Sequence, residues 1–536
     1  MLPNIDKLSL TQQVAQMLVV RASGYLFDHQ IQYPDWETST AKLINWVQNL
    51  GIGGIIFVGA SAGEIAIRTS QLQSRAKIPL LMAADIEEGV GQRFSGATWF
   101  PPPMALSAIF RQNSKLGVYY AEQMGIFTAQ EALGIGINWV LAPVVDVNNN
   151  PNNPVINVRA FGETTDEVKE LACAFIRGVN KYPILTTAKH FPGHGDTEVD
   201  SHLELPKISH SESHLAEVEL PPFLAAIDSG ADMVMAAHLL IPSWDDRFPA
   251  TLSHKILTGK LRQELGFSGL ITTDALVMGA ITNYYEPNEA PVMAVEAGAD
   301  ILLMTVDPEG AINAICKAVE NGRITPLQIR ESVERIWRAK EKTAQNRMDV
   351  ISSTQLVGTP EARMTVKEIV QHSLITNISL NLSPTKFINS TPANNFPSNK
   401  TFTELRNLIV VDNPLKCPHI NHMAPAVDLP EKMGYHTQIC DHEYFQTINL
   451  QGDFPTLLQL FIRGNPFNGS ASFNETAIDF LKGVLTNKGL QAFVVYGSPY
   501  VWRQFIPLMN VNTPGVFSYG QMPIAQEVAL LYLFGS

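Results

Sequence analysis

Eight short apolar runs that alternate with longer amphipathic stretches constrain the fold of this chain more than any other feature. Each run is continuously apolar, as expected of a strand that is buried on both faces. Such strands alternating with helices indicate a parallel sheet, and eight units predict a closed (β/α)8 barrel. The runs lie at 17–20, 54–58, 79–84, 137–142, 184–188, 233–237, 270–273 and 301–304, and helices are expected at 40–50, 62–75, 113–133, 164–180, 213–229, 253–265, 288–298 and 326–345.

The chain is too long for a barrel alone. It has 536 residues, whereas a barrel of this type takes about 250 residues or somewhat more. We predict a barrel domain over 1–345, a helix and a linker over 346–404, and a smaller three-layer α/β domain over 405–536. The linker is expected at 381–400, which is rich in Ser, Thr, Asn and Pro, and one helix at 360–374. In the last domain, strand-like runs lie at 408–412, 457–462 and 492–496, before a helix at 523–533.

Composition excludes several classes of protein. Apolar residues make up 45% and charged residues 17% of the chain, which is typical of a globular protein. The net charge of −13 argues against nucleic acid or an anionic membrane as a partner. No apolar run is long enough for a membrane span, and the first residues lack the pattern of a secretion signal. We therefore expect a cytoplasmic protein, and the oligomeric state stays open.

Polar residues are densest in the segment 189–202. Lys189 and His190 end an apolar run, and Pro192, Gly193 and Gly195 then indicate a loop. Polar groups this dense beside a buried strand are costly to bury unless they have a task. In parallel barrels the active site lies at the carboxyl ends of the strands. Other polar residues follow runs in the same way, namely Asp85, His238 and Asp274, so we predict the active site at this end.

The segment from Lys189 to Thr197 reads Lys-His-Phe-Pro-Gly-His-Gly-Asp-Thr and is followed by Asp-Ser-His at 200–202. It resembles the signature of the β-N-acetylglucosaminidases of glycoside hydrolase family 3. Further similarity lies in Arg-Ala-Phe-Gly at 159–162, in Thr-Asp-Ala-Leu-Val-Met at 273–278 and in the segment 85–94. That last segment departs from the family pattern Asp-x-Glu-Gly-Gly-Arg-Val-x-Arg-Phe. It has Glu88, Val90 and Gly91 where the family has Gly, Arg and Val.

The resemblance implies a retaining exo-β-N-acetylhexosaminidase that acts on terminal β-linked N-acetylglucosamine. Its substrate would be an amino-sugar oligosaccharide or a muropeptide from peptidoglycan turnover. Retention requires a carboxylate nucleophile and a second group that acts as acid and then as base. The resemblance assigns the nucleophile to Asp274, which by its position alone could equally be the N-cap of the next helix.

The resemblance assigns the acid/base to His202, paired with Asp200. An imidazole can donate and accept a proton near neutral pH, and a neighbouring carboxylate stabilises the imidazolium. The alternative is a solvated loop histidine. Substrate hydroxyls would be bound through charge-assisted hydrogen bonds, and the alternative for each binding residue is a structural salt bridge. The expected binding residues are Asp85, Arg93, Arg159, Lys189 and His190.

We expect neither a cofactor nor a metal. A metal site at His190, His194, Asp196 and His202 is the competing interpretation, but Pro192 and Gly193 prevent the first two histidines from sharing a helix face. Three other functions also stay open: a β-glucosidase, a glycoside phosphorylase, and a sugar-binding protein with impaired catalysis.

Overall fold

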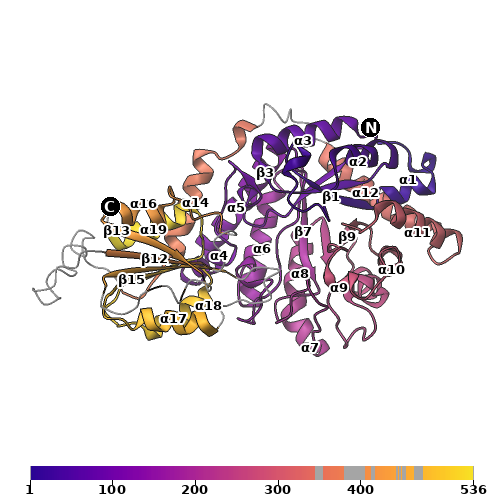
Figure 1. The fold of residues 1–536 in the computed structure, drawn as a ribbon. Helices are drawn as coiled ribbons and strands as arrows, with labels where there is room; N and C mark the ends of the chain where they lie inside the picture. The colour runs from indigo at the N-terminus through magenta and orange to yellow at the C-terminus, as the bar shows by residue number, and fades with distance from the viewer. Residues whose placement is uncertain are drawn as a thin grey trace, which may run out of the picture.

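The chain folds into an eight-stranded parallel barrel and a smaller α/β domain beside it (Figure 1). This computed structural model describes residues 2–344, 354–378, 405–411, 417–441, 445, 448, 454–463 and 475–534. The predicted fold class is confirmed, whereas the linker predicted at 381–400 lies outside the described residues. No helix within these ranges is both long and apolar enough to cross a lipid bilayer.

All eight apolar runs form barrel strands. Their order is β10-β1-β2-β4-β6-β7-β8-β9, and every neighbouring pair is parallel. A parallel bridge between Thr272 and Ile301 joins the last strand to the first and closes the barrel. The strands are β1 (Leu18–Ser23), β2 (Gly54–Val58), β4 (Leu81–Ala84), β6 (Trp139–Val140), β7 (Leu185–Phe191), β8 (Met233–Ala236), β9 (Leu270–Thr273) and β10 (Leu302–Leu303). The short strands β3 (Ala60–Ser61) and β5 (Phe94–Ser95) pair separately.

Helices surround the barrel, and local capping explains where several of them begin. Ser61 and Glu64 form a capping box at the start of α3, and Thr164 caps α6. The helices are α1 (Leu10–Ala15), α2 (Thr40–Asn45) with η3 (Trp46–Leu50), α3 (Ala62–Arg75), α4 (Met104–Gln112), α5 (Ser114–Gly134), α6 (Thr165–Val179), α7 (Glu212–His214), η6 (Leu215–Glu219), α8 (Leu220–Asp228), η8 (Lys255–Glu264), α9 (Gly279–Thr282), α10 (Glu289–Ala297), α11 (Pro308–Glu320) and α12 (Pro326–Ala344).

A buried lysine closes the amino end of the barrel. Lys340 of α12 is 1% exposed, and its Nζ donates to Gln16 Oε1 at 2.7 Å and to the carbonyl oxygen of Gly53 at 3.0 Å. Gln16 and Gly53 lie just before β1 and β2, so the lysine ties both strand starts to the last barrel helix. Burial lowers the pKa of Lys340 to about 7.

This lysine makes stability depend on pH. In the unfolded chain Lys340 titrates near 10.5, so above about pH 7 the unfolded state binds the additional proton and the free energy of unfolding rises with pH. Compared with Lys340→Met, the wild type should gain up to about 1.4 kcal/mol per pH unit between about pH 7 and pH 10. Urea unfolding at several pH values measures this difference. Parallel curves for the two proteins would show that the lysine is not held in a lowered-pKa environment.

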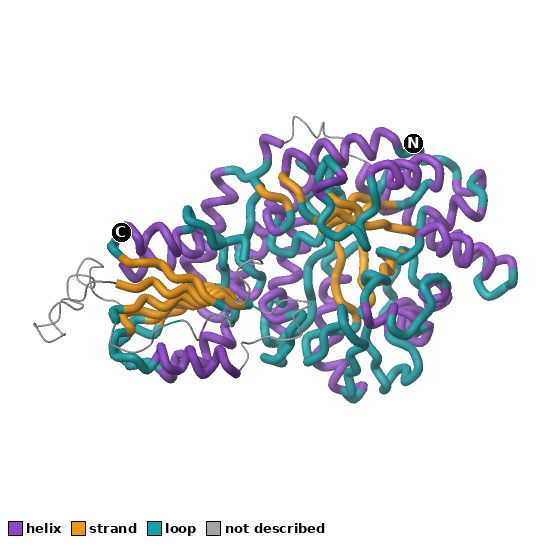
Figure 2. Tube along the Cα trace, in the orientation of Figure 1, coloured by secondary structure: helices purple, strands orange, loops and turns teal. Residues whose placement is uncertain are grey.

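The second domain is a six-stranded sheet between two layers of helices. Its order is β11-β16-β15-β14-β12-β13, and only β11 is antiparallel to its neighbour. Helices α16 and α19 cover one face, and α17 and α18 cover the other (Figures 1 and 2). The elements are β11 (Ile375–Thr376), β12 (Leu405–Val411), α16 (Pro425–Lys432), β13 (Tyr435–Cys440), β14 (Thr456–Ile462), α17 (Glu475–Leu485), β15 (Leu490–Gly497), α18 (Pro499–Phe505), β16 (Gly515–Ser518) and α19 (Pro523–Phe534). The helix α14 (Pro360–Ser373), predicted at 360–374, precedes this sheet and packs on both α4 and α19.

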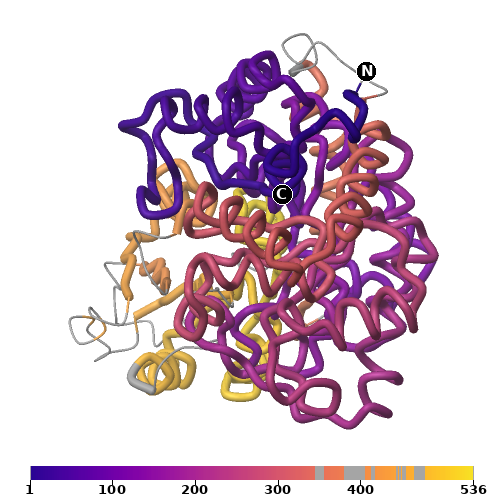
Figure 3. Tube along the Cα trace, turned by 90° about the vertical axis from the view of Figure 1, so that its right-hand side faces the viewer, coloured from indigo at the N-terminus to yellow at the C-terminus, as the bar shows by residue number. Residues whose placement is uncertain are grey.

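The second domain packs against the barrel, and Figure 3 shows its yellow C-terminal segment behind the barrel. Two contacts come from residues that follow the carboxyl ends of its own parallel strands. Arg463 follows β14 and pairs with Glu88 of the barrel at 2.6 Å. Tyr500 follows β15, and its hydroxyl accepts a hydrogen bond from Asn148 Nδ2 at 2.6 Å. The sequence left open whether this domain packs on the barrel, and the structure shows that it does.

Candidate active site

Five neighbouring barrel strands each deliver a chemically active side chain at their carboxyl ends. Strand register aligns these ends, because Phe191 of β7 pairs with Ala236 of β8, and Ala236 pairs with Thr273 of β9. The side chains therefore gather at one mouth of the barrel. In strand order they are Asp85 after β4, Asp146 after β6, Lys189 and His190 in β7, His238 after β8 and Asp274 after β9.

A charged network fills one side of this mouth. Lys189 Nζ lies 2.8 Å from Asp85 Oδ1 and 2.5 Å from Glu87 Oε1. The guanidinium of Arg159 forms two hydrogen bonds of 2.8 Å to the Glu87 carboxylate. Burial alone would raise the pKa of Glu87, but Arg159 and Lys189 hold it well below its usual value. Two cations and two anions thus balance in a largely buried site, which limits the cost of burying them.

The residues of the network differ in how far their side chains are already engaged by protein partners. The guanidinium of Arg159 is occupied by Glu87 and by the carbonyl oxygen of Val155, as the salt-bridge alternative anticipated. Arg93 lies outside the network, and its Nε donates to the main-chain oxygen of Asp85 at 3.0 Å. Asp85 has the most exposed side chain of the four network members, at 29%, so it has the freest face toward the mouth.

The segment 88–91, which departs from the family pattern, has a structural explanation. The carboxylate of Glu88 accepts hydrogen bonds from Trp99 Nε1 at 2.9 Å and from Arg463 of the second domain. A Cβ added to Gly91 would lie 2.6 Å from the backbone of 97–99, so the turn packs too tightly for a side chain. Glu88 therefore helps to join the two domains, while Glu87 still faces Lys189.

Asp146 holds His190 and was not among the predicted site residues. Its Oδ2 lies 2.8 Å from His190 Nδ1, and its Oδ1 accepts main-chain hydrogen bonds from His190 and His194. Burial would raise the pKa of Asp146, but the neighbouring His190 lowers it. Since Nδ1 is occupied, Nε2 is the ring nitrogen of His190 that can meet a ligand. The available sequence signal was the position of Asp146 after the apolar run 137–142.

The loop after β7 is held by hydrogen bonds between its own side chains. His194 contacts Thr197 Oγ1 at 2.9 Å through Nδ1 and Ser201 Oγ at 3.0 Å through Nε2, so this histidine holds the loop in shape. Burial lowers the pKa of His194 to about 4. A Cβ on Gly195 would lie 1.7 Å from the Val147 carbonyl oxygen, so the loop passes close enough to the neighbouring chain to require glycine.

Asp200 and His202 lie together at the end of this loop. His202 Nδ1 is 2.8 Å from Asp200 Oδ1, which also accepts the His202 main-chain N–H at 2.9 Å. The Asp200 side chain is 1% exposed, whereas His202 is 21% exposed. The loop docks on the segment after β9, because Gly279 N donates to the carbonyl oxygen of His202 at 3.0 Å. The imidazole is thus oriented by a buried carboxylate and remains partly exposed.

Asp274 lies among three histidines. Burial alone would raise its pKa, but His238, His190 and His202 together lower it to about 2. Its Oδ1 accepts a hydrogen bond of 2.7 Å from the main-chain N–H of Ala275. The carboxylate is therefore ionised at neutral pH.

The N-cap alternative for Asp274 does not hold. The next helix, α9, begins at Gly279, and its N-cap position is Met278. Asp274 is thus an ionised carboxylate at a strand end that interacts electrostatically with His202. It does not cap a helix.

Comparisons with known proteins agree with this architecture over both domains. Residues 9–339 match the Glycosyl hydrolase family 3 N terminal domain, and residues 398–535 match the Bacterial Glycosyl hydrolase family 3 C-terminal domain. A solved β-N-acetylglucosaminidase of this family from a Paenibacillus species superposes with a TM-score of 0.79 and 28% identity. That alignment covers 98% of this chain and 97% of the other.

Curated relatives match about three fifths of this chain. Beta-hexosaminidase A of Pseudoalteromonas piscicida is 34% identical over 62% of this chain, and a beta-N-acetylglucosaminidase/beta-glucosidase of Cellulomonas fimi is 27% identical over 63%. The matched region spans only 60% and 61% of the lengths of these two relatives. The family match nevertheless covers more than half of this chain, and it includes the segment 189–202 on which the resemblance was based. The chain therefore belongs to glycosyl hydrolase family 3.

Proposed function

We propose that this protein is a retaining exo-β-N-acetylhexosaminidase that removes terminal β-linked N-acetylglucosamine. The observation that carries the proposal is the ionised Asp274 at a strand end, close to the imidazole of His202, which is held by Asp200. The names of the relatives from Pseudoalteromonas and Paenibacillus support the same activity. By resemblance, muropeptides are the natural substrates that we propose.

In the proposed reaction, Asp274 attacks the anomeric carbon while the imidazolium of His202 protonates the departing oxygen. The C–O bond to the aglycone breaks, and an ester forms between the sugar and Asp274. Neutral His202 then takes a proton from water, whose oxygen attacks the anomeric carbon and releases Asp274. Asp200 stabilises the imidazolium and keeps Nδ1 engaged.

The charged network would bind the sugar. Asp85, Lys189 and His190 border the mouth and can bind hydroxyl groups through charge-assisted hydrogen bonds. Arg159 acts on the substrate through Glu87 in this proposal, because its guanidinium is already engaged. Arg93 supports the backbone of Asp85 and completes the proposed binding set.

Turnover of aryl glycosides tests the proposal. Purified protein should hydrolyse an aryl N-acetyl-β-glucosaminide with a kcat/KM about tenfold or more above that for the aryl β-glucoside, since groups that bind the acetamido moiety would be unpaired with glucose. The released sugar should be N-acetylglucosamine in both phosphate and a non-nucleophilic buffer. A preference for glucose would identify a β-glucosidase instead, and no turnover of either would identify a sugar-binding protein.

The assay in phosphate buffer tests a second candidate function. A histidine at the acid/base position carries no negative charge when neutral, so it repels incoming phosphate less than a carboxylate would. Formation of N-acetylglucosamine 1-phosphate in place of the free sugar would identify a phosphorylase.

A further inference from the structure

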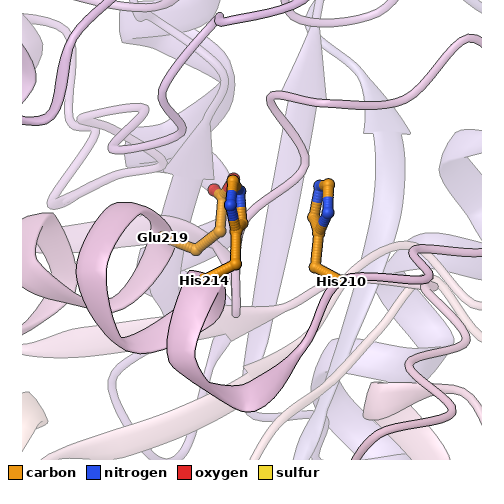
Figure 4. Close-up of side chains that lie close together, drawn as sticks. All are labelled: His210, His214 and Glu219. Atoms are coloured by element: carbon orange, nitrogen blue, oxygen red, sulfur yellow. The ribbon is translucent and has the colours of Figure 1, made fainter.

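Three side chains converge beside the loop 193–202, outside the proposed sugar site. His210 precedes α7, His214 ends α7 and Glu219 ends η6. Their potential ligand atoms all lie within 4.8 Å of one another. Figure 4 shows the two imidazole rings standing side by side, with the Glu219 carboxylate next to His214. The ring centroids of the two histidines are 4.0 Å apart.

Four buried polar atoms of this cluster make no hydrogen bond. Nε2 of His210, Nε2 of His214 and both carboxylate oxygens of Glu219 are buried without a hydrogen bond. They are four of the nine such side-chain atoms among the described residues, so unpaired polar atoms concentrate here. Buried polar atoms are almost always paired, and each one left unpaired is costly. Burial, together with the negative charges of Asp146 and Asp196, raises the pKa of Glu219 to about 8.

We propose that His210, His214 and Glu219 bind a Zn²⁺ ion. Two imidazoles and a carboxylate are a donor set that suits zinc. Asp196 is placed to be the fourth ligand, because its Oδ2 lies 3.0 Å from His210 Nε2 without the alignment of a hydrogen bond. A dication would give every orphaned atom a partner and offset the two carboxylate charges.

The site would fasten the loop that carries Asp200 and His202. Asp196 belongs to that loop, and the Glu219 carboxylate lies directly against it: a Cβ added to Gly193 would be 2.3 Å from Glu219 Oε2. A bound ion would therefore tie the loop to α7 and η6. Metal binding itself does not depend on the proposed function, whereas an effect on turnover does.

Metal uptake without substrate tests the proposal. Chelator-treated protein is dialysed against Zn²⁺ and analysed for metal, and Co²⁺ serves as a spectroscopic substitute. We expect one Zn²⁺ per chain and a visible spectrum typical of Co²⁺ bound by nitrogen and oxygen in a tetrahedral site. His210→Ala and Glu219→Gln should each weaken binding by at least about tenfold, whereas His254→Ala, which removes an exposed histidine of the same domain, should not.

A second readout reports on the loop. Zn²⁺ should slow amide hydrogen exchange in residues 193–202 of the wild type and leave the Glu219→Gln protein unaffected. Circular dichroism verifies that each variant folds. If a variant does not fold, Zn²⁺ uptake by the wild type still tests the proposal. No stoichiometric uptake by the wild type, or wild-type affinity for Zn²⁺ in both His210→Ala and Glu219→Gln, would overturn the zinc site.

Discussion

Replacement of Asp274 by Ala is expected to reduce kcat/KM for an aryl N-acetyl-β-glucosaminide on the order of 10⁴-fold or more, in line with the loss of other catalytic nucleophiles. The carboxylate forms the only covalent bond to the sugar in the proposed reaction, so no other group can replace it. Its hydrogen bond to Ala275 is local, and the variant should therefore fold. Asp228→Ala is the matched control, since Asp228 is exposed at the end of α8 and should leave turnover unchanged.

An external nucleophile sharpens this test. In the Asp274→Ala protein, azide can occupy the vacated space and attack the anomeric carbon directly. The product should then be the α-glycosyl azide, because a single displacement inverts the configuration that two displacements retain. Wild-type turnover in the Asp274→Ala protein, or rescue that gives a β-azide, would contradict the assignment of the nucleophile.

Replacement of His202 by Ala should slow hydrolysis most for substrates whose leaving group must be protonated. For a disaccharide, whose leaving group is a poor one, we expect a loss of about 10²- to 10⁴-fold in kcat/KM, which is the usual contribution of a general acid. For a dinitrophenyl glycoside, which leaves without protonation, the loss in the glycosylation step should be about tenfold or less. A series of aryl substrates measures this as a steeper dependence of log kcat/KM on leaving-group pKa.

Asp200→Asn separates positioning from proton transfer. The amide keeps the shape of the side chain but cannot stabilise the imidazolium that lies 2.8 Å away. The dependence of log kcat/KM on leaving-group pKa in Asp200→Asn should therefore fall between those of the wild type and His202→Ala. His254→Ala should retain the wild-type slope. If the His202→Ala slope is parallel to that of the wild type, His202 is not the acid, and a group elsewhere at the mouth must supply the proton.

The strands could be predicted from sequence because burial on both faces gives each of them a continuous apolar run. The same logic fails for α4, where Met104 to Ile109 are all buried and no polar face marks a helix. Helix α11 carried a usable signal in Pro308 at its first turn, although the sequence pattern did not lead us to expect it.

The candidate site was less predictable where partners lie far apart along the chain. Asp85, Lys189 and Asp274 could be located because each follows or ends a run. Glu87 meets Arg159 72 residues later, and Glu88 meets Arg463 375 residues later. No local pattern reveals such pairs, so their roles became visible only in the fold.

The competing metal interpretation shows the same limit. His190, His194 and His202 are dense in sequence, yet each has a hydrogen-bond partner in the fold. The orphaned ring nitrogens belong instead to His210 and His214. Spacing alone cannot tell a satisfied histidine from an unsatisfied one.

Identification of the covalent intermediate tests the central claim most directly. Brief reaction with a fluorinated N-acetylglucosaminyl fluoride, which forms the glycosyl-enzyme faster than water releases it, should trap the sugar on the protein. After proteolysis, mass spectrometry should find the label on the peptide that contains Asp274, at that residue. A label on another carboxylate, or steady turnover of this reagent with no labelled protein, would contradict the proposed mechanism.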